Sequence, residues 1–379
     1  MGQRDLTVVL ATYNEVEAVG PMVRQLLSQL DGEGGLLREV IVVDDDSPDG
    51  TADVVRQLGR QDPRIHLLLR CDRSGLASAI RDGLLSASGE LAAVMDADGQ
   101  HDPAVIHTAV TLLEQQEFDL VVASRFPADS GRGGGDSQRV AGLSAKRQSG
   151  SERANWLARR SLPPVYGHLN DLMSGFMVLR LASTRAAIRR VNLAGFKFLY
   201  ELLSVSEGKF KVGEVPLNFR SRQTGNSKLD QAIVWDWLVS LLHTFTGRIM
   251  PRRAISFGLV GVTGMAIHAG IFFVLRIAGQ SFLSSQIVAV VVAASFNYLV
   301  NNILTFRASR LRGTALLIGL IKFLLVCSLG LVANISVSTV VYDNMREDSL
   351  GTVAVFAGIV VDFIWKYAAS SRLVWNVPY

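Results

Sequence analysis

The stretch LAAVMDADGQHDP at residues 91–103 joins an apolar run to two aspartates one residue apart and further polar residues. The run has the length of a strand, and the acceptor side chains begin where it ends. Two earlier stretches have the same form, LTVVLATYNE (6–15) and REVIVVDDDS (38–47). Continuous apolar runs without alternation are typical of strands buried on both faces of a parallel sheet.

Helical patterns separate these predicted strands, which gives a βαβα order. The expected helices cover 19–30, 52–59 and 76–88, and a further strand covers 65–70. The order predicts an α/β fold, a doubly wound and mostly parallel sheet. Such sheets bind ligands at the carboxyl ends of their strands, so Tyr13, Asp45 and Asp96 are expected to lie on one edge.

The rest of this half is less regular. Residues 124–152 are rich in Gly, Ser and Arg and predict a long loop, followed by a helix over 153–160. Residues 192–203 are helical in their last part. The stretch VGEVPLNF (212–219) contains a proline and predicts a strand at the edge of the sheet.

The composition changes near residue 250, where long apolar stretches replace the mixed pattern. Four stretches have the length of a membrane span, and they cover 254–277, 282–305, 314–341 and 351–370. The chain is therefore predicted to hold a catalytic domain over 1–228 and an all-α transmembrane domain of four helices over 251–379. Residues 229–250, with Trp235 and Trp237, predict an amphipathic helix at the membrane interface between them.

The charged residues beside the predicted spans indicate how the chain is oriented in the membrane. Arginines 248, 252 and 253 precede the first span and arginines 307, 310 and 312 follow the second, whereas residues 342–348 are acidic. By the positive-inside rule, both termini and the catalytic domain are expected in the cytoplasm of a multi-pass membrane protein. The N-terminus lacks the pattern of a signal peptide, and Cys71 and Cys327 give no disulfide framework. A net charge of +4 without a basic, aromatic stripe excludes nucleic-acid binding.

The acceptors in 91–103 suggest a metal site. Two carboxylates leaving one strand at positions i and i+2, with Gln100 beyond them, are hard oxygen ligands suited to Mg²⁺ or Mn²⁺. An Asp pair after a strand is as often a turn or a helix cap. We expect this second role for Asp44, Asp46 and Asp49, before a helix near Thr51, and we expect Asp102 to start the next helix. His101 fits a ligand or a packed loop histidine equally well.

Together with the motifs given below, these residues make the chain resemble the inverting glycosyltransferases of family 2, which have the GT-A fold, and among them the dolichyl-phosphate and polyprenyl-phosphate mannosyltransferases. The membrane half resembles the GtrA-like domain of four spans, through FNYLVNNILTF (296–306). The other motifs that carry the resemblance are TYNE (12–15), DDDSPDGT (44–51), RSGLASA (73–79), MDADGQHDP (95–103), SRF (124–126), DLMSGF (171–176), GFKFLYELL (195–203), EVP (214–216) and RQTGNSKL (222–229).

The resemblance implies a role for each matching position. The nucleotide base and ribose would lie against Ala11, Tyr13, Glu15, Val43 and Asp45. The metal, Mg²⁺ or Mn²⁺, and the diphosphate would be held by Asp96, Ala97, Asp98 and Gln100. The catalytic positions would be Asp98 together with Arg125, Arg147 and Ser151, which would receive the lipid phosphate. Phosphate or sugar would be clamped by Lys197, Arg222 and Lys228, and Asp98 or Asp171 would orient the donor sugar.

The implied reaction is the transfer of mannose from GDP-mannose to a polyprenyl or dolichyl phosphate, with inversion to a β-linked product. Departures from the family pattern, among them Ala11 for Pro, Gly99 for Leu and Met173 for Thr, leave the donor open, so UDP-glucose is the rival. An inactive catalytic domain on a lipid-sugar translocator or scaffold is a third reading, which the intact D-x-D-x-Q argues against.

Charged side chains inside the predicted spans need partners, because an isolated charge in a bilayer is costly. Asp362 and Lys366 are separated by four residues and are expected to pair on one helix face. We interpret Lys322, His268 and Asn301 as contacts within the helix bundle or as interfacial groups, rather than as parts of a transport pathway.

Overall fold

The computed structural model describes residues 5–31, 35–71, 75–126, 145–193, 197–217, 231–343 and 351–377. Its chain divides into two compact units, Met1–Phe245 and Thr246–Tyr379. The first unit contains the acceptor clusters, and the second contains the apolar stretches, so each is described by itself.

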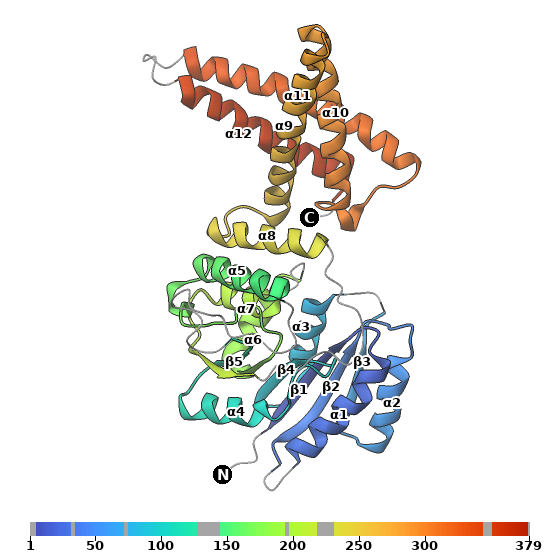
Figure 1. Ribbon diagram of the computed structural model, residues 1–379, viewed down its shortest axis with the longest axis vertical. Coiled ribbons are helices and arrows are strands. Elements are labelled where there is room, and N and C mark those ends of the chain that lie inside the picture. The colour runs from blue at the N-terminus through green and yellow to red at the C-terminus, as the bar shows by residue number, and fades with distance from the viewer. Residues whose placement is uncertain are drawn as a thin grey trace. The chain divides into compact units, whose positions relative to one another are not determined.

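The first unit is built on a seven-stranded sheet with the order β3-β2-β1-β4-β6-β5-β7 (Figure 1). The strands are β1 (Leu6–Thr12), β2 (Leu37–Asp44), β3 (Ile65–Leu69), β4 (Leu91–Asp96), β5 (Leu120–Ser124), β6 (Met177–Arg180) and β7 (Val212–Pro216). All neighbouring pairs are parallel except the two that β6 makes with β4 and β5. The mostly parallel, doubly wound sheet predicted from the apolar runs is confirmed.

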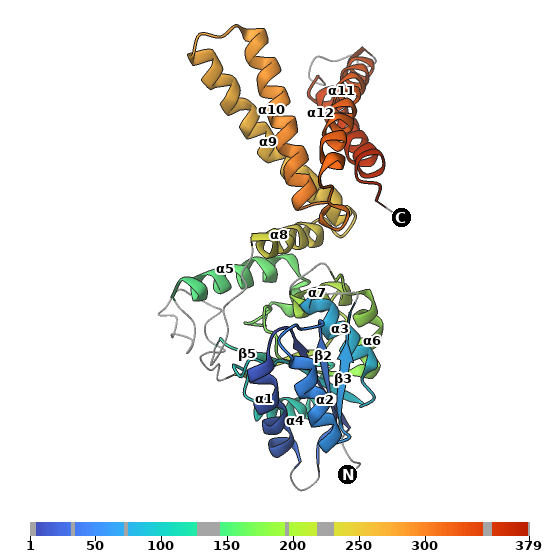
Figure 2. The same ribbon diagram turned by 90° about the vertical axis from the view of Figure 1, so that its right-hand side faces the viewer.

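Helices cover both faces of this sheet (Figures 1 and 2). One face packs against α1 (Val16–Leu30), α2 (Thr51–Gln61) and α4 (Val105–Gln115). The other packs against α3 (Leu76–Ser86), α6 (Leu181–Arg190) and α7 (Phe198–Ser206), and α5 (Ala145–Ser161) and α8 (Gln231–Phe245) close over that side. Each face has its own apolar core, because side chains along a strand point alternately to the two sides.

The helix α8 packs on the sheet domain through both apolar and polar contacts. Leu241 belongs to the core that also contains α7, and the Oγ of Ser240 donates a hydrogen bond to the buried carboxylate of Glu201. Ser204 and Thr244 pair through their hydroxyl groups at 3.1 Å. A membrane-interface role for this helix, and the boundaries predicted for it, stay predictions.

Two predicted elements need correction. The loop expected over 124–152 ends earlier, because α5 begins at Ala145 and not near 153. Its first turns are polar, so apolar periodicity could not reveal them, although Ala, Lys, Arg and Gln are good helix formers. The short strand β6 was not predicted; it has four residues and follows the turn of DLMSGF directly.

The second unit is helical. It contains α9 (Arg252–Ile277), α10 (Phe282–Ile303), α11 (Thr314–Asp343) and α12 (Gly351–Ala369), whose ends lie within two residues of those of the four predicted spans. Within the described residues, three helices are long and apolar enough to cross a membrane: α9, α10 and residues 314–337 of α11. The expected intrahelical pair is present on α12, with Lys366 Nζ 2.7 Å from an oxygen of Asp362.

Candidate active site

Strand register brings three predicted nucleotide-binding positions side by side. Ala11 on β1 is paired with Val43 on β2 and with Asp96 on β4. These three residues come from separate parts of the sequence and form one row across the carboxyl end of the sheet. Val43 is fully buried, and its place in this row is set by the strand register alone.

The aspartates after β2 mainly support the backbone. Asp44 is fully buried and accepts hydrogen bonds from the N–H (2.9 Å) and the hydroxyl (2.7 Å) of Ser47. Asp49 accepts from the N–H of Thr51 at 3.0 Å and, with its other oxygen, from the first N–H of α1 at 3.1 Å. Asp49 therefore satisfies the first N–H of two helices, as the capping role expected of it requires, whereas Asp44 holds the turn before α2. Asp46 lies exposed in the turn, with a φ of 53°.

Asp45 has a partner that sequence reasoning missed. Its carboxylate accepts from both Nε and Nη2 of Arg70 and, through the other oxygen, from the N–H of Gly75 at 2.7 Å. Arg70 also contacts Asp82 at 3.1 Å and Ser78 at 2.8 Å. The arginine follows an apolar strand and carries no motif of its own, so only the fold identifies it as the group that holds Asp45.

The D-x-D segment lies at the end of β4. The side chain of Asp96 is 41 % exposed, whereas that of Asp98 is buried and accepts from the N–H of Gln100 at 3.0 Å. His101 is buried beneath them. Its Nδ1 accepts from the N–H of Asp96 at 3.0 Å, and its ring lies 5.3 Å from that of Phe176. Burial lowers the pKa of His101, against the charges of Asp96 and Asp98, so the ring is a neutral packed support for the segment.

The donor set at this strand end fits a hard divalent cation. Gly175 lies against Asp96, and a Cβ at that position would be 3.1 Å from a carboxylate oxygen, so glycine keeps the carboxylate unobstructed. Among the described residues, no three His, Cys, Asp or Glu side chains gather as a metal group. Two carboxylates and an amide suit Mg²⁺ or Mn²⁺, which take their other ligands from phosphate and water.

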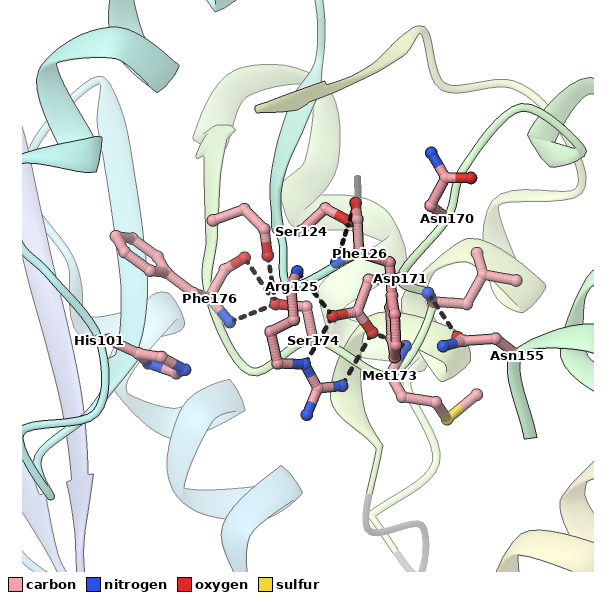
Figure 3. A network of polar contacts seen from close by, with 12 residues as sticks. His101, Ser124, Arg125, Phe126, Asn155, Asn170, Asp171, Met173, Ser174 and Phe176 are labelled. Carbon is pink, nitrogen blue, oxygen red and sulfur yellow. Dashed lines mark hydrogen bonds and ion pairs between the residues drawn. The ribbon is translucent and has the colours of Figure 1, made fainter. Parts of the chain in front are cut away.

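Arg125 is fixed by a buried carboxylate (Figure 3). Its Nε and Nη2 donate to the two oxygens of Asp171 at 2.7 and 2.9 Å, and its N–H donates to the same group at 3.2 Å. Burial raises the pKa of Asp171, but the charge and hydrogen bonds of Arg125 outweigh burial and hold that pKa below its ordinary value. Asp171 is fully buried and positions Arg125, so the expectation that it orients a donor sugar is not met in this structure.

Lys197 lies directly before α7 and faces the same group of charges. Its Nζ is 3.4 Å from the carbonyl oxygen of Met173. Burial, together with the nearby charge of Arg125, lowers the pKa of Lys197 to about 8, while Asp171 and Asp96 act in the opposite direction. Asp96, Arg125, Asp171 and Lys197 therefore interact electrostatically, and an anion beside the two cations would relieve their repulsion.

Glu214 on β7 supports the segment that carries Asp171. Its carboxylate accepts from the N–H groups of Asn170 (2.9 Å) and Asp171 (3.0 Å) and from the side-chain amide of Asn170 (2.7 Å). Three stretches that the sequence presented separately, SRF, DLMSGF and EVP, are in this way parts of one network around Arg125.

The other predicted positions lie as follows. Tyr13 is 46 % exposed after β1, and Glu15 precedes α1. Ser151 is half-buried on α5. Ala97 is buried between the two aspartates of the D-x-D segment. Residue 147 belongs to the helix α5, but its side chain lies outside the described part of the structure, and so do Arg222 and Lys228 entirely.

The two units match two known domain families. Residues 7–183 match the model of glycosyl transferase family 2, and residues 256–375 match that of the GtrA/DPMS transmembrane domain. With the long apolar helices, the second match makes this a multi-pass membrane protein. Among solved structures, glucosyl-3-phosphoglycerate synthase from Mycobacterium tuberculosis is similar, with 20% identity and a TM-score of 0.48 over 64% of this chain and 80% of that chain.

Two curated relatives are more informative. The dolichol-phosphate mannosyltransferase of Saccharomyces cerevisiae is 28% identical over 67% of this chain and 91% of its own length. That of Pyrococcus furiosus is 31% identical over 98% of this chain and 99% of its own length, which includes the membrane unit. The chain therefore belongs to the dolichol-phosphate mannosyltransferase family of glycosyltransferases.

Proposed function

We propose that this protein transfers mannose from GDP-mannose to a dolichyl or polyprenyl phosphate, giving a β-linked lipid-phosphate mannose. The observation that carries the proposal is the 31% identity over nearly the full length to a relative named for this reaction. The geometry supports it, because acceptor oxygens for a metal and a nucleotide lie on the same sheet edge as two cations suited to phosphate.

The donor is assigned to the strand ends. The base and ribose are assigned to the row Val43–Ala11–Asp96, with Tyr13 and Asp45 beside it, because the strand register brings the row together at the carboxyl end of the sheet. Bound at Asp96, Asp98 and Gln100, Mg²⁺ or Mn²⁺ would supply positive charge for the departing diphosphate. The exposed carboxylate of Asp96 and the bare backbone of Gly175 fit this assignment.

The acceptor is assigned to Arg125 with Arg147 and Ser151, and Lys197, Arg222 and Lys228 are assigned to the donor phosphates or sugar. A lipid phosphate is already an anion at neutral pH, so its oxygen needs positioning more than a general base. Arg125 supplies this because Asp171 holds two of its nitrogens and keeps the guanidinium in one orientation. The phosphate oxygen attacks the anomeric carbon, the bond to the diphosphate breaks, and its electron pair leaves with GDP.

We place this reaction on the cytoplasmic face. Arginines flank α9 on its N-terminal side and fill the connection between α10 and α11, which by the positive-inside rule puts both regions, and the catalytic unit before them, in the cytoplasm. The charged nucleotide-sugar and the phosphate of the lipid acceptor would then meet on this cytoplasmic face.

The test uses the purified full-length protein with labelled GDP-mannose or UDP-glucose, a short-chain polyprenyl phosphate, and Mn²⁺, Mg²⁺ or chelator. We expect a chloroform-soluble product from GDP-mannose that requires both the metal and the lipid phosphate, with none from the corresponding prenol. A product from UDP-glucose alone would reassign the sugar. No product from either donor would refute the proposed reaction and favour a scaffold or translocator.

A further inference from the structure

Asn155 on α5 is buried, with only 3 % of its surface exposed. Only one end of its side-chain amide makes a hydrogen bond within the described part of the chain. Its Oδ1 accepts a hydrogen bond from the N–H of Leu172 at 2.9 Å. Because a backbone N–H can only donate, this bond fixes which end of the amide faces Leu172. The Nδ2 end has no hydrogen-bond partner in the described part of the chain.

The residue contacts the segment that organises Arg125 (Figure 3). Leu172 lies between Asp171, which holds the guanidinium of Arg125, and Met173, whose carbonyl oxygen accepts from Lys197. Through Oδ1, Asn155 therefore ties α5 to the stretch that places both cations. Buried amide groups are nearly always paired, so an Nδ2 without a partner among the described residues needs an explanation.

The spacing of residues along α5 shows which face of the helix Asn155 shares with other site positions. Residues 147, 151 and 155 are spaced by four along α5 and so follow one another on one face of the helix. The first two are the positions that the proposed function assigns to the lipid phosphate. Asn155 stands one turn further along this face, on its buried part, where Ala158 and Leu162 continue into the core.

We propose that the Nδ2 of Asn155 donates a hydrogen bond to a phosphate oxygen of the lipid acceptor, as a specificity-determining contact; this rests on the proposed function. The chemistry favours phosphate over a sugar hydroxyl. Because Oδ1 is occupied by Leu172, Asn155 offers only donors, which match the three acceptor oxygens of a phosphate monoester. The same side chain then holds Leu172, next to the residue that pairs with Arg125, through Oδ1 and binds the lipid phosphate through Nδ2.

The substitution Asn155→Asp tests this directly. The aspartate keeps an oxygen for the N–H of Leu172 but replaces the donor with an acceptor that repels phosphate. We expect the KM for a short-chain polyprenyl phosphate to rise at least roughly tenfold, with the KM for the nucleotide-sugar unchanged. Asn155→Ala removes the donor without adding a charge and should raise the same KM, which covers the case in which the aspartate variant does not fold.

The control is Arg160→Gln on the same helix, whose guanidinium stacks on Trp156 at 4.8 Å and which should leave both KM values unchanged. Binding of a prenyl phosphate, compared with its prenol, is measured alongside turnover. An acceptor KM and prenyl-phosphate affinity equal to wild type in a folded variant would overturn the inference, as would a rise confined to the donor KM. A wild-type protein that neither turns over nor binds prenyl phosphate would instead refute the proposed function.

Discussion

The buried pair between Arg125 and Asp171 should contribute strongly to the stability of the catalytic unit, and Asp171→Asn tests it. Asp171 is fully buried and the side chain of Arg125 is 13 % exposed. The substitution removes the negative charge and one of the two acceptors and leaves an uncompensated guanidinium, a loss that typically costs about 3–5 kcal/mol. For a unit of this size, such a loss lowers Tm by roughly 6–20 °C.

Full-length protein in detergent is suited to this measurement, with thermal unfolding followed by circular dichroism and activity assayed below the transition. The lowered pKa of Asp171 adds a pH dependence with a defined sign: the contribution is present above its unfolded pKa and is lost as pH falls through the lower folded value. Asp171→Asn should abolish this acid-side loss.

A double-mutant cycle with Arg125→Gln separates the pair from its surroundings, because the second change removes the stranded charge and should recover part of the lost stability. Additive effects of the two substitutions, or an Asp171→Asn variant that melts within about 2 °C of wild type, would show that the pair does not hold this segment.

Asp98→Ala should abolish turnover while the protein still inserts into membranes; normal activity in a purified sample would remove Asp98 from the metal site. If activity depends on the ammonium form of Lys197, it should fall as pH rises through about 8. Lys197→Arg should move this alkaline fall in activity to higher pH. A pH profile that is not moved would assign the fall to another group. Gly175→Ala places a methyl group 3.1 Å from Asp96 and should raise the KM for the donor with little change in Tm, which steady-state kinetics and melting would check. Asp362→Leu should reduce the amount of folded protein in membranes, and Asp362→Leu with Lys366→Leu should restore it, as measured by fluorescence-detected size exclusion; equal loss in both would argue against the pair.

Much of the sheet was predictable because its signal is local. The runs that became β1, β2 and β4 are continuous and apolar, and each is followed by its own acceptors, so the carboxyl-end rule alone predicted a shared edge. The strand β6 was not predicted from the sequence because it has only four residues and runs antiparallel to both of its neighbours. Nothing in so short a run distinguishes it from a buried turn.

The roles of individual acids were harder to predict, because a carboxylate's role depends on which cation reaches it. Nothing in the sequence shows that the fold supplies Asp45 with Arg70 and Asp171 with Arg125. Asp96, by contrast, keeps an exposed carboxylate because its neighbour in space is Gly175. These partners lie 25 to 79 residues away along the chain, beyond the reach of any local pattern.

The sequence by itself determined the two-part organisation, the strand ends that carry the acceptors and the length of the membrane helices, since each depends on the polarity of consecutive residues. The tertiary structure decided the order of the strands, with β1 between β2 and β4, and hence the row of Val43, Ala11 and Asp96. It also decided that Asp171 holds Arg125 and that, within the described part of the chain, the Nδ2 of Asn155 has no hydrogen-bond partner. The reason is that ion pairing, burial and hydrogen-bond satisfaction belong to neighbours in space, which the chain acquires only when it folds.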